Sequence, residues 1–82
     1  MSEEVKTAED IAQDYTAMGH SVDLINGIIG GTEMTTHTTD EKNDCVSRNK
    51  EHLELMVAKD DWGDEDMTAS NSAISAATSY LA

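Results

Sequence analysis

The sequence predicts an all-α protein in which an antiparallel helical hairpin and a third, C-terminal helix form one small helical bundle. Three observations support this fold class. Apolar residues recur at helical spacing in three segments, near residues 8–29, 39–60 and 64–80. The stretches between the segments are short, and proline, which breaks helices, is absent from the 82 residues. A chain of this length makes at most one domain, so we expect residues 1–82 to fold as a unit.

The first segment, residues 8–29, has the most regular apolar pattern. Its apolar residues follow one another at spacings of four and three, and they are Ile11, Tyr15, Met18, Val22, Ile25 and Ile29. This is the spacing of a heptad seam, the stripe by which one helix packs on another. Gly19 and Gly27 interrupt the seam, each costing about 1 kcal/mol relative to alanine, and we expect a kink at Gly19. Gly30 and Gly31 should end the helix, because glycine readily adopts a positive φ.

The second segment begins with a capping signal. Thr38 and Glu41 match the S/T-x-x-E capping box, in which each residue bonds the backbone N–H of the other. The helix is expected over residues 39–60, and four residues share one of its faces: Val46, Asn49, Leu53 and Met56. At 1.5 Å per residue the first two helices are each about 30 Å long. Similar lengths and a short Thr-rich connection favour an antiparallel hairpin.

The third segment, residues 64–80, is distinguished by its lack of charge. Asp64 is its expected N-cap, but no charged residue occurs from Met67 to Ala82. At helical spacing one side carries Met67, Ser70, Ile74, Ala77 and Leu81. A helix in water normally has charges on its outer face, so we expect this helix to pack on more than one side, against the hairpin and against a second copy or another protein. The alternative is a weakly helical, solvated Ser/Thr tail.

The composition is strongly acidic. Seventeen acidic and five basic residues give a net charge of −12, which disfavours direct binding to nucleic-acid phosphates or to an anionic membrane surface. The charge is interpreted either as a means of solubility or as an acidic surface that competes with a nucleic acid for a basic protein. One cysteine cannot form an internal disulfide, the N-terminal residues lack the apolar region of a signal peptide, and no apolar stretch is long enough to span a membrane.

Residues that bear chemistry do not form a recognisable site in the sequence. The acidic run at residues 60–66 lacks the order of an EF-hand calcium loop, and is interpreted as a corner between helices. Cys45 and His52 lie about 10 Å apart along one helix, too far to share a zinc ion, and His20 and His37 lie elsewhere in the chain. No phosphate-binding glycine loop or catalytic triad spacing occurs. We therefore expect no enzymatic activity, catalytic residue, metal or cofactor.

The predicted function is protein–protein association. The chain has no Phe, one Trp and two Tyr, so its core is thin and support from self-association or a partner is expected. Trp62 is interpreted as an anchor that packs the corner on the hairpin. The residues expected to take part in association are Ile11, Tyr15, Met18, Val22, Ile25, Ile29, Trp62, Ile74 and Leu81.

Part of the chain resembles a known group of proteins. Residues 48–62, with the sequence Arg-Asn-Lys-Glu-His-Leu-Glu-Leu-Met-Val-Ala-Lys-Asp-Asp-Trp, carry the resemblance together with residues 65–69 and 73–74. Over residues 45–81 the chain is similar to small uncharacterised accessory proteins of tailed bacteriophages. The resemblance implies a phage-encoded protein located in the virion or in the cytoplasm of the infected bacterium, and it supplies no catalytic or binding residues.

Two functions are compatible with these observations. The first is a non-enzymatic accessory or virion-associated structural protein that self-associates or docks on a larger phage or host assembly through helical packing. The alternative is an anti-defence inhibitor whose acidic surface binds a host nucleic-acid-binding protein. The two differ in their dependence on salt, because charge mimicry weakens with ionic strength and apolar packing does not.

Overall fold

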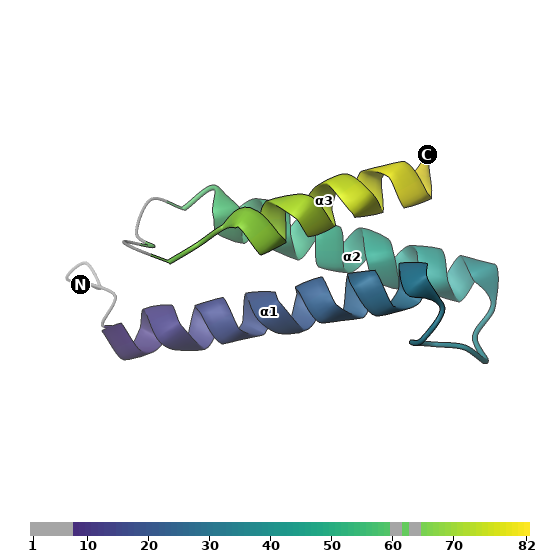
Figure 1. The fold of residues 1–82 in the computed structure, drawn as a ribbon, viewed down its shortest axis with the longest axis horizontal. Helices are drawn as coiled ribbons and strands as arrows, with labels where there is room; N and C mark the ends of the chain where they lie inside the picture. The colour runs from purple at the N-terminus through teal and green to yellow at the C-terminus, as the bar shows by residue number, and fades with distance from the viewer. Residues whose placement is uncertain (1–7, 60–61, 63–64) are drawn as a thin grey trace, which may run out of the picture.

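The computed structural model describes residues 8–59, 62 and 65–82, and these form three helices and no strand. The helices are α1 (Ala8–Gly30), α2 (Thr39–Val57) and α3 (Thr68–Leu81). Each helix packs against the other two. Figure 1 shows α1 and α2 running antiparallel and α3 returning beside them in the direction of α1. The predicted all-α bundle is confirmed.

Helix α1 runs through Gly19 without a break in its helical structure, at the position where a kink was expected. The helix ends as predicted, at Gly30, and Gly31 follows with φ of 85°. The chain then folds back on the helix: the backbone N–H groups of Thr32 and Glu33 donate to the carbonyl of Gly27 at 2.8 and 3.1 Å. These bonds satisfy a carbonyl that the end of the helix would otherwise leave unpaired.

Helix α2 begins at the predicted capping box. The backbone N–H of Glu41 donates to Thr38 Oγ1 at 3.1 Å, and the backbone N–H of Thr38 donates to Glu41 Oε1 at 2.8 Å. The bond from the Thr38 backbone favours the ionised carboxylate and lowers the pKa of Glu41. The helix ends at Val57, before the predicted limit at residue 60.

Helix α3 begins at Thr68, later than predicted, and the predicted cap Asp64 lies outside the described residues. The N-cap position is Met67, which makes no side-chain capping bond. Asp66, one residue earlier, satisfies the first helical N–H instead: its Oδ1 accepts from the Thr68 backbone N–H at 2.9 Å and from Thr68 Oγ1 at 2.6 Å. The hydroxyl and backbone bonds from Thr68 lower the pKa of Asp66. The acidic residue nearest the helix is therefore the one that satisfies its first turn.

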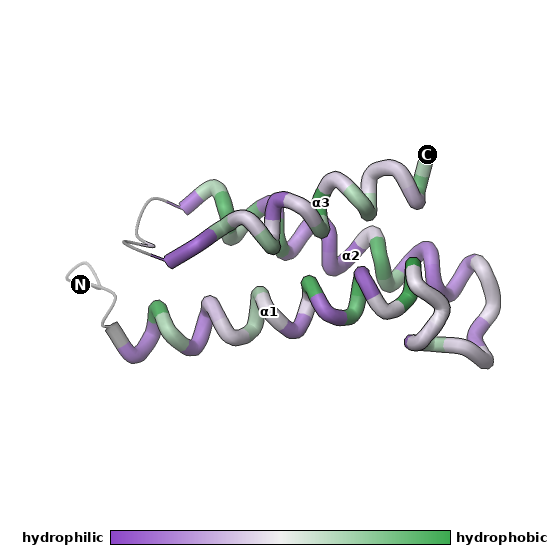
Figure 2. The backbone as a smooth tube through the Cα atoms, viewed as in Figure 1, coloured by the Kyte–Doolittle hydropathy of each residue, from purple (hydrophilic) through white to green (hydrophobic). Residues whose placement is uncertain are grey.

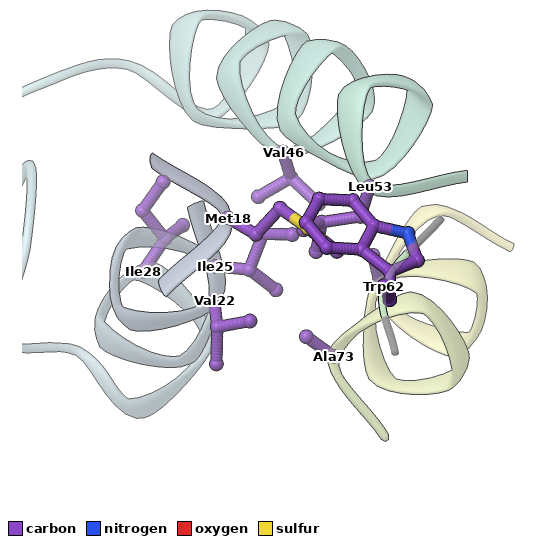
Figure 3. Packing of buried hydrophobic residues seen from close by; sticks show 9 residues of the cluster. Met18, Val22, Ile25, Ile28, Val46, Leu53, Trp62 and Ala73 are labelled. Carbon is purple, nitrogen blue, oxygen red and sulfur yellow. The ribbon is translucent and has the colours of Figure 1, made fainter. Parts of the chain in front are cut away.

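The core lies where the three helices and Trp62 meet, as Figure 3 shows in close-up. Its buried apolar residues are Met18, Val22, Ile25, Ile28, Val46, Leu53, Trp62, Ala73 and Ala77. Trp62 is buried, as predicted for an anchor, and its indole Nε1–H donates to the Met56 carbonyl at 2.7 Å. This bond ties the chain after α2 to the end of that helix.

Two details of the predicted apolar faces are wrong. Ile29 is 39% exposed, and Ile28 is buried in its place. Ile28 lies two helical turns after Ser21, whose hydroxyl bonds His52 of α2, so both residues are on the side of α1 that faces α2. In α3 the buried residues include Ala73, which the predicted row omitted.

The residues of the α1 seam, which were expected to take part in association, lie mainly inside the bundle. Met18, Val22 and Ile25, at the centre of the seam, are buried within a single chain. Ile11 and Tyr15 are half-buried against the same core. The seam therefore packs the bundle itself, and a surface for a partner has to be sought elsewhere.

Candidate functional site

Large apolar side chains contribute little to the described surface. Only Ile29 and Leu55 are classed as exposed among the large hydrophobic residues of the described chain, at 39% and 67%. They lie on different helices, at the C-terminal end of α1 and in α2.

The outer face of α3 is uncharged, in contrast to the rest of the molecule. Its exposed polar residues are Thr68, Asn71, Ser72, Ser75, Thr78 and Ser79. Figure 2 shows α3 mostly pale, whereas hydrophilic purple recurs along α1 and α2. The opposite face of α3 is buried through Ser70, Ala73 and Ala77. Within one chain α3 therefore packs on one side and presents small polar residues on the other.

Three half-buried apolar side chains border this outer face. Ile74, Tyr80 and Leu81 are packed against the core yet remain partly accessible. On the outer face itself, the Thr78 hydroxyl donates to the Ile74 carbonyl at 2.8 Å, a bond that satisfies the side chain within its own helix. We define the outer face of α3 as its six exposed Ser, Thr and Asn residues together with this apolar border.

Two of the three cations of α2 are paired with acids of the same helix. Arg48 Nε lies 2.9 Å from Asp44 Oδ2, and Lys50 Nζ lies 3.0 Å from Glu54 Oε2, each at helical spacing. The pairs are partly or largely exposed and contribute little to stability. Two of the five basic residues are thereby neutralised by neighbouring carboxylates. Few positive charges are left to offset the other acidic residues of the chain.

A small hollow lies between α1 and the start of α3. Its α1 side is formed by Tyr15, Met18, Gly19, Val22 and Asp23, and its other side by Asp66, Ala69 and Ser70. The volume is about 180 Å³. Tyr15 holds the two sides together, because its hydroxyl donates to the Asp66 carbonyl at 2.6 Å and its ring lies 6.3 Å from that of Trp62, at 57°.

Ser70 is the unusual polar residue of the hollow. It is only 4% exposed, yet its hydroxyl makes no hydrogen bond to any residue that the structure describes. The hydroxyl oxygen is not fully occluded, since no completely buried side-chain N or O atom lacks a partner in the described chain. The sequence pattern placed Ser70 on the packed side of the helix; a serine among apolar positions was the available signal of a polar group in the interior.

A second polar contact missed by sequence reasoning joins α1 to α2. Ser21 Oγ and His52 Nδ1 are 3.0 Å apart, with Ser21 buried and His52 half-buried. No carboxylate of the described residues bonds His52, so the pair lacks the third member of a catalytic triad. We interpret the pair as a hydrogen bond that fixes the register of the two helices.

The residues considered for metal binding do not come together in the described structure. Among residues 8–59, 62 and 65–82, no three His, Cys, Asp or Glu side chains are placed to hold an ion. Asp60, Asp61 and Asp64 of the acidic run lie outside the described residues. Cys45 is a half-buried thiol, and Asn49 Nδ2 lies 2.8 Å from its carbonyl and 3.4 Å from its sulfur.

The nine residues predicted for association do not form one surface. Met18, Val22, Ile25 and Trp62 belong to the core, whereas Ile29 is exposed at the end of α1. Ile11 and Tyr15 are half-buried, as are Ile74 and Leu81 on α3. Of the predicted set, only Ile74 and Leu81 lie beside an exposed face of unusual composition.

Comparisons with known proteins give no relative. No protein-family model matches the chain, and no curated protein or solved structure shows significant similarity to it. None of the helices in the described part of the chain is long and apolar enough to cross a membrane.

Proposed function

We propose that the protein is a non-enzymatic accessory protein of a tailed bacteriophage, and that it docks on a larger assembly or a second copy through the outer face of α3. The phage context rests on the resemblance of residues 45–81. The docking surface rests on one observation: the outer face of α3 carries no charge in a chain whose net charge is −12.

Electrostatics favours this face over others. A protein surface that approaches the carboxylates of α1 and α2 either needs complementary cations or meets repulsion. Approach to α3 encounters only short uncharged side chains, which allow two helices to come close and cost little side-chain entropy. Ile74, Tyr80 and Leu81 are partly accessible at its border, so docking would complete their burial and gain hydrophobic free energy.

Placing a charge on this face tests the proposal. Ser75 lies exposed on the outer face of α3, and Ser47 lies exposed on α2, so Ser75→Glu and Ser47→Glu change the net charge equally. We expect Ser75→Glu to abolish self-association in sedimentation velocity, or incorporation into phage particles measured by mass spectrometry. Ser47→Glu should leave the same readout unchanged. Equal behaviour of the two variants, or a wild-type chain that neither self-associates nor enters particles, would contradict the proposal.

The acidic surface supports a second candidate function. Only five basic residues accompany the 17 acidic ones, and two of the five are paired within α2, so the chain keeps a large negative charge of the kind that an inhibitor of a host nucleic-acid-binding protein would need. Binding of this kind weakens steeply as salt rises, and it competes with the nucleic acid. Binding to a host protein that persists at high salt and is lost in Ser75→Glu would favour docking through α3 instead.

A further inference from the structure

We propose that the hollow between α1 and α3 binds a primary alkylammonium group, either of a polyamine or of a lysine side chain. The hollow is separate from the outer face of α3, because Ser70 lies on the buried side of that helix. The inference therefore stands or fails independently of docking through α3.

The size and floor of the hollow suit an alkyl chain. Its volume is about 180 Å³, and a protein cavity of about 150 Å³ holds a molecule the size of benzene. Met18, Val22 and Ala69 supply an apolar lining on which methylene groups can pack. One small ligand or one side chain fits this space, but a larger ring system does not.

The polar groups around the hollow are hydroxyls and carboxyl-bearing side chains, and one of these residues, Ser70, is buried. Ser70 is more than nine-tenths buried, and its hydroxyl has no partner among the described residues. A helical serine commonly donates to the carbonyl four residues before it, which here is that of Asp66. That carbonyl already accepts the Tyr15 hydroxyl at 2.6 Å. Ser70 does not add a second bond to it, so the Ser70 hydroxyl, which can both donate and accept, stays available to a group that enters the hollow.

The charge of the site selects a cation. Two acidic residues, Asp23 and Asp66, are among the residues that line the hollow, and no lysine or arginine is among them. Thr68 occupies Oδ1 of Asp66, and the second oxygen of that carboxylate stays available as an acceptor. An ammonium group has three donors and no acceptor, which matches a hydroxyl oxygen and two carboxylates. The alkyl chain of the ligand can pack on the apolar lining, whereas a hydrated metal ion makes no favourable contact with apolar side chains.

Titration of the full-length chain with n-butylammonium chloride tests the inference. We expect saturable shifts of amide NMR signals confined to residues near the hollow, at constant ionic strength. n-Butanol has the same alkyl chain without the charge, and sodium chloride has the charge without the chain. Neither should reproduce the shifts.

Variants assign the binding to named groups. Ser70→Ala loses no hydrogen bond within the described chain, and Asp23 is exposed, so both Ser70→Ala and Asp23→Asn should keep the fold. We expect each to raise the dissociation constant about tenfold, the loss anticipated for one hydrogen bond to a charged group. Glu51→Gln removes the same charge from the exposed surface of α2 and should leave binding unchanged. Asp66 is left intact, since it accepts the first backbone N–H of α3.

Two further ligands distinguish the sources of the ammonium group. Spermidine represents a free polyamine, and Nα-acetyl-lysine amide represents a side chain of a partner protein. Tighter binding of one identifies the natural source. Shifts spread over the whole acidic surface, equally reduced by Asp23→Asn and Glu51→Gln, would overturn the inference, as would the absence of saturable shifts.

Discussion

The two glycines inside α1 provide a sharp test of the fold, because the same substitution meets opposite surroundings. A Cβ added at Gly19 has no heavy atom within 4 Å. A Cβ added at Gly27 lies 2.3 Å from Glu33 Cγ, 3.1 Å from Glu33 Cβ and 3.3 Å from Thr32 Oγ1. The end of the exposed Glu33 side chain can rotate away. Its Cβ is held by a backbone whose N–H donates to the Gly27 carbonyl at 3.1 Å.

The expected effects follow from these distances. Gly19→Ala should stabilise the protein by about 1 kcal/mol, the difference in helix propensity between the two residues. In a domain of this size that gain raises Tm by about 4–8 °C. Gly27→Ala gains the same propensity, but overpacking costs about 1–3 kcal/mol. We therefore expect Gly27→Ala to be between neutral and destabilising by about 2 kcal/mol.

Urea unfolding followed by far-UV circular dichroism measures both changes. The two positions lie about 12 Å apart along α1, so the effects in the double variant should add. Equal stabilisation by both substitutions would refute the close packing of residues 32–33 on α1. Destabilisation by Gly19→Ala would show that α1 is not a regular helix at that position.

Three further predictions concern the core and the helix ends. Ile28→Ala should lower the free energy of unfolding by about 2–5 kcal/mol and Ile29→Ala by less than about 1 kcal/mol; the reverse order in urea melts would contradict the burial of Ile28. Because the Thr38 backbone N–H holds the pKa of Glu41 below its ordinary value of 4.5, the carboxylate stabilises the fold above that pH, and this contribution is lost as the pH falls through the folded-state pKa. The difference in stability between wild type and Glu41→Gln should thus shrink on acidification below pH 4.5, and a difference independent of pH would refute it. Trp62→Phe loses the indole bond to an α2 carbonyl and should cost about 1–3 kcal/mol in thermal melts; an unchanged Tm would show that the bond does not form.

Features whose cause is local were predictable from the sequence. The capping box of α2 depends on two residues three positions apart, and the end of α1 depends on Gly30 and the positive φ of Gly31. The bond from the Thr68 backbone N–H to Asp66 was not predictable in this way, since several acids precede that helix.

Features that depend on how the helices face one another could not be predicted. A heptad pattern selects Ile29 instead of Ile28 because of its spacing alone. The burial of Ile28 depends on which side of α1 is covered by α2. The Ser21–His52 contact joins residues 31 positions apart, and the hollow joins α1 to α3. No periodicity within a single helix contains that information.

The position of Trp62 gives the protein a built-in spectroscopic reporter. It is the only tryptophan, it is buried where the chain passes from α2 to α3, and the ring of Tyr15 on α1 lies 6.3 Å away. Its emission should be blue-shifted in the native state, and light absorbed by the nearby tyrosine should be transferred to it. Loss of this signal reports separation of the helices, whereas circular dichroism reports loss of the helices themselves. If the two transitions coincide, the packing of α3 and the hairpin forms in one cooperative step; if the fluorescence changes first, α3 can detach while α1 and α2 remain folded.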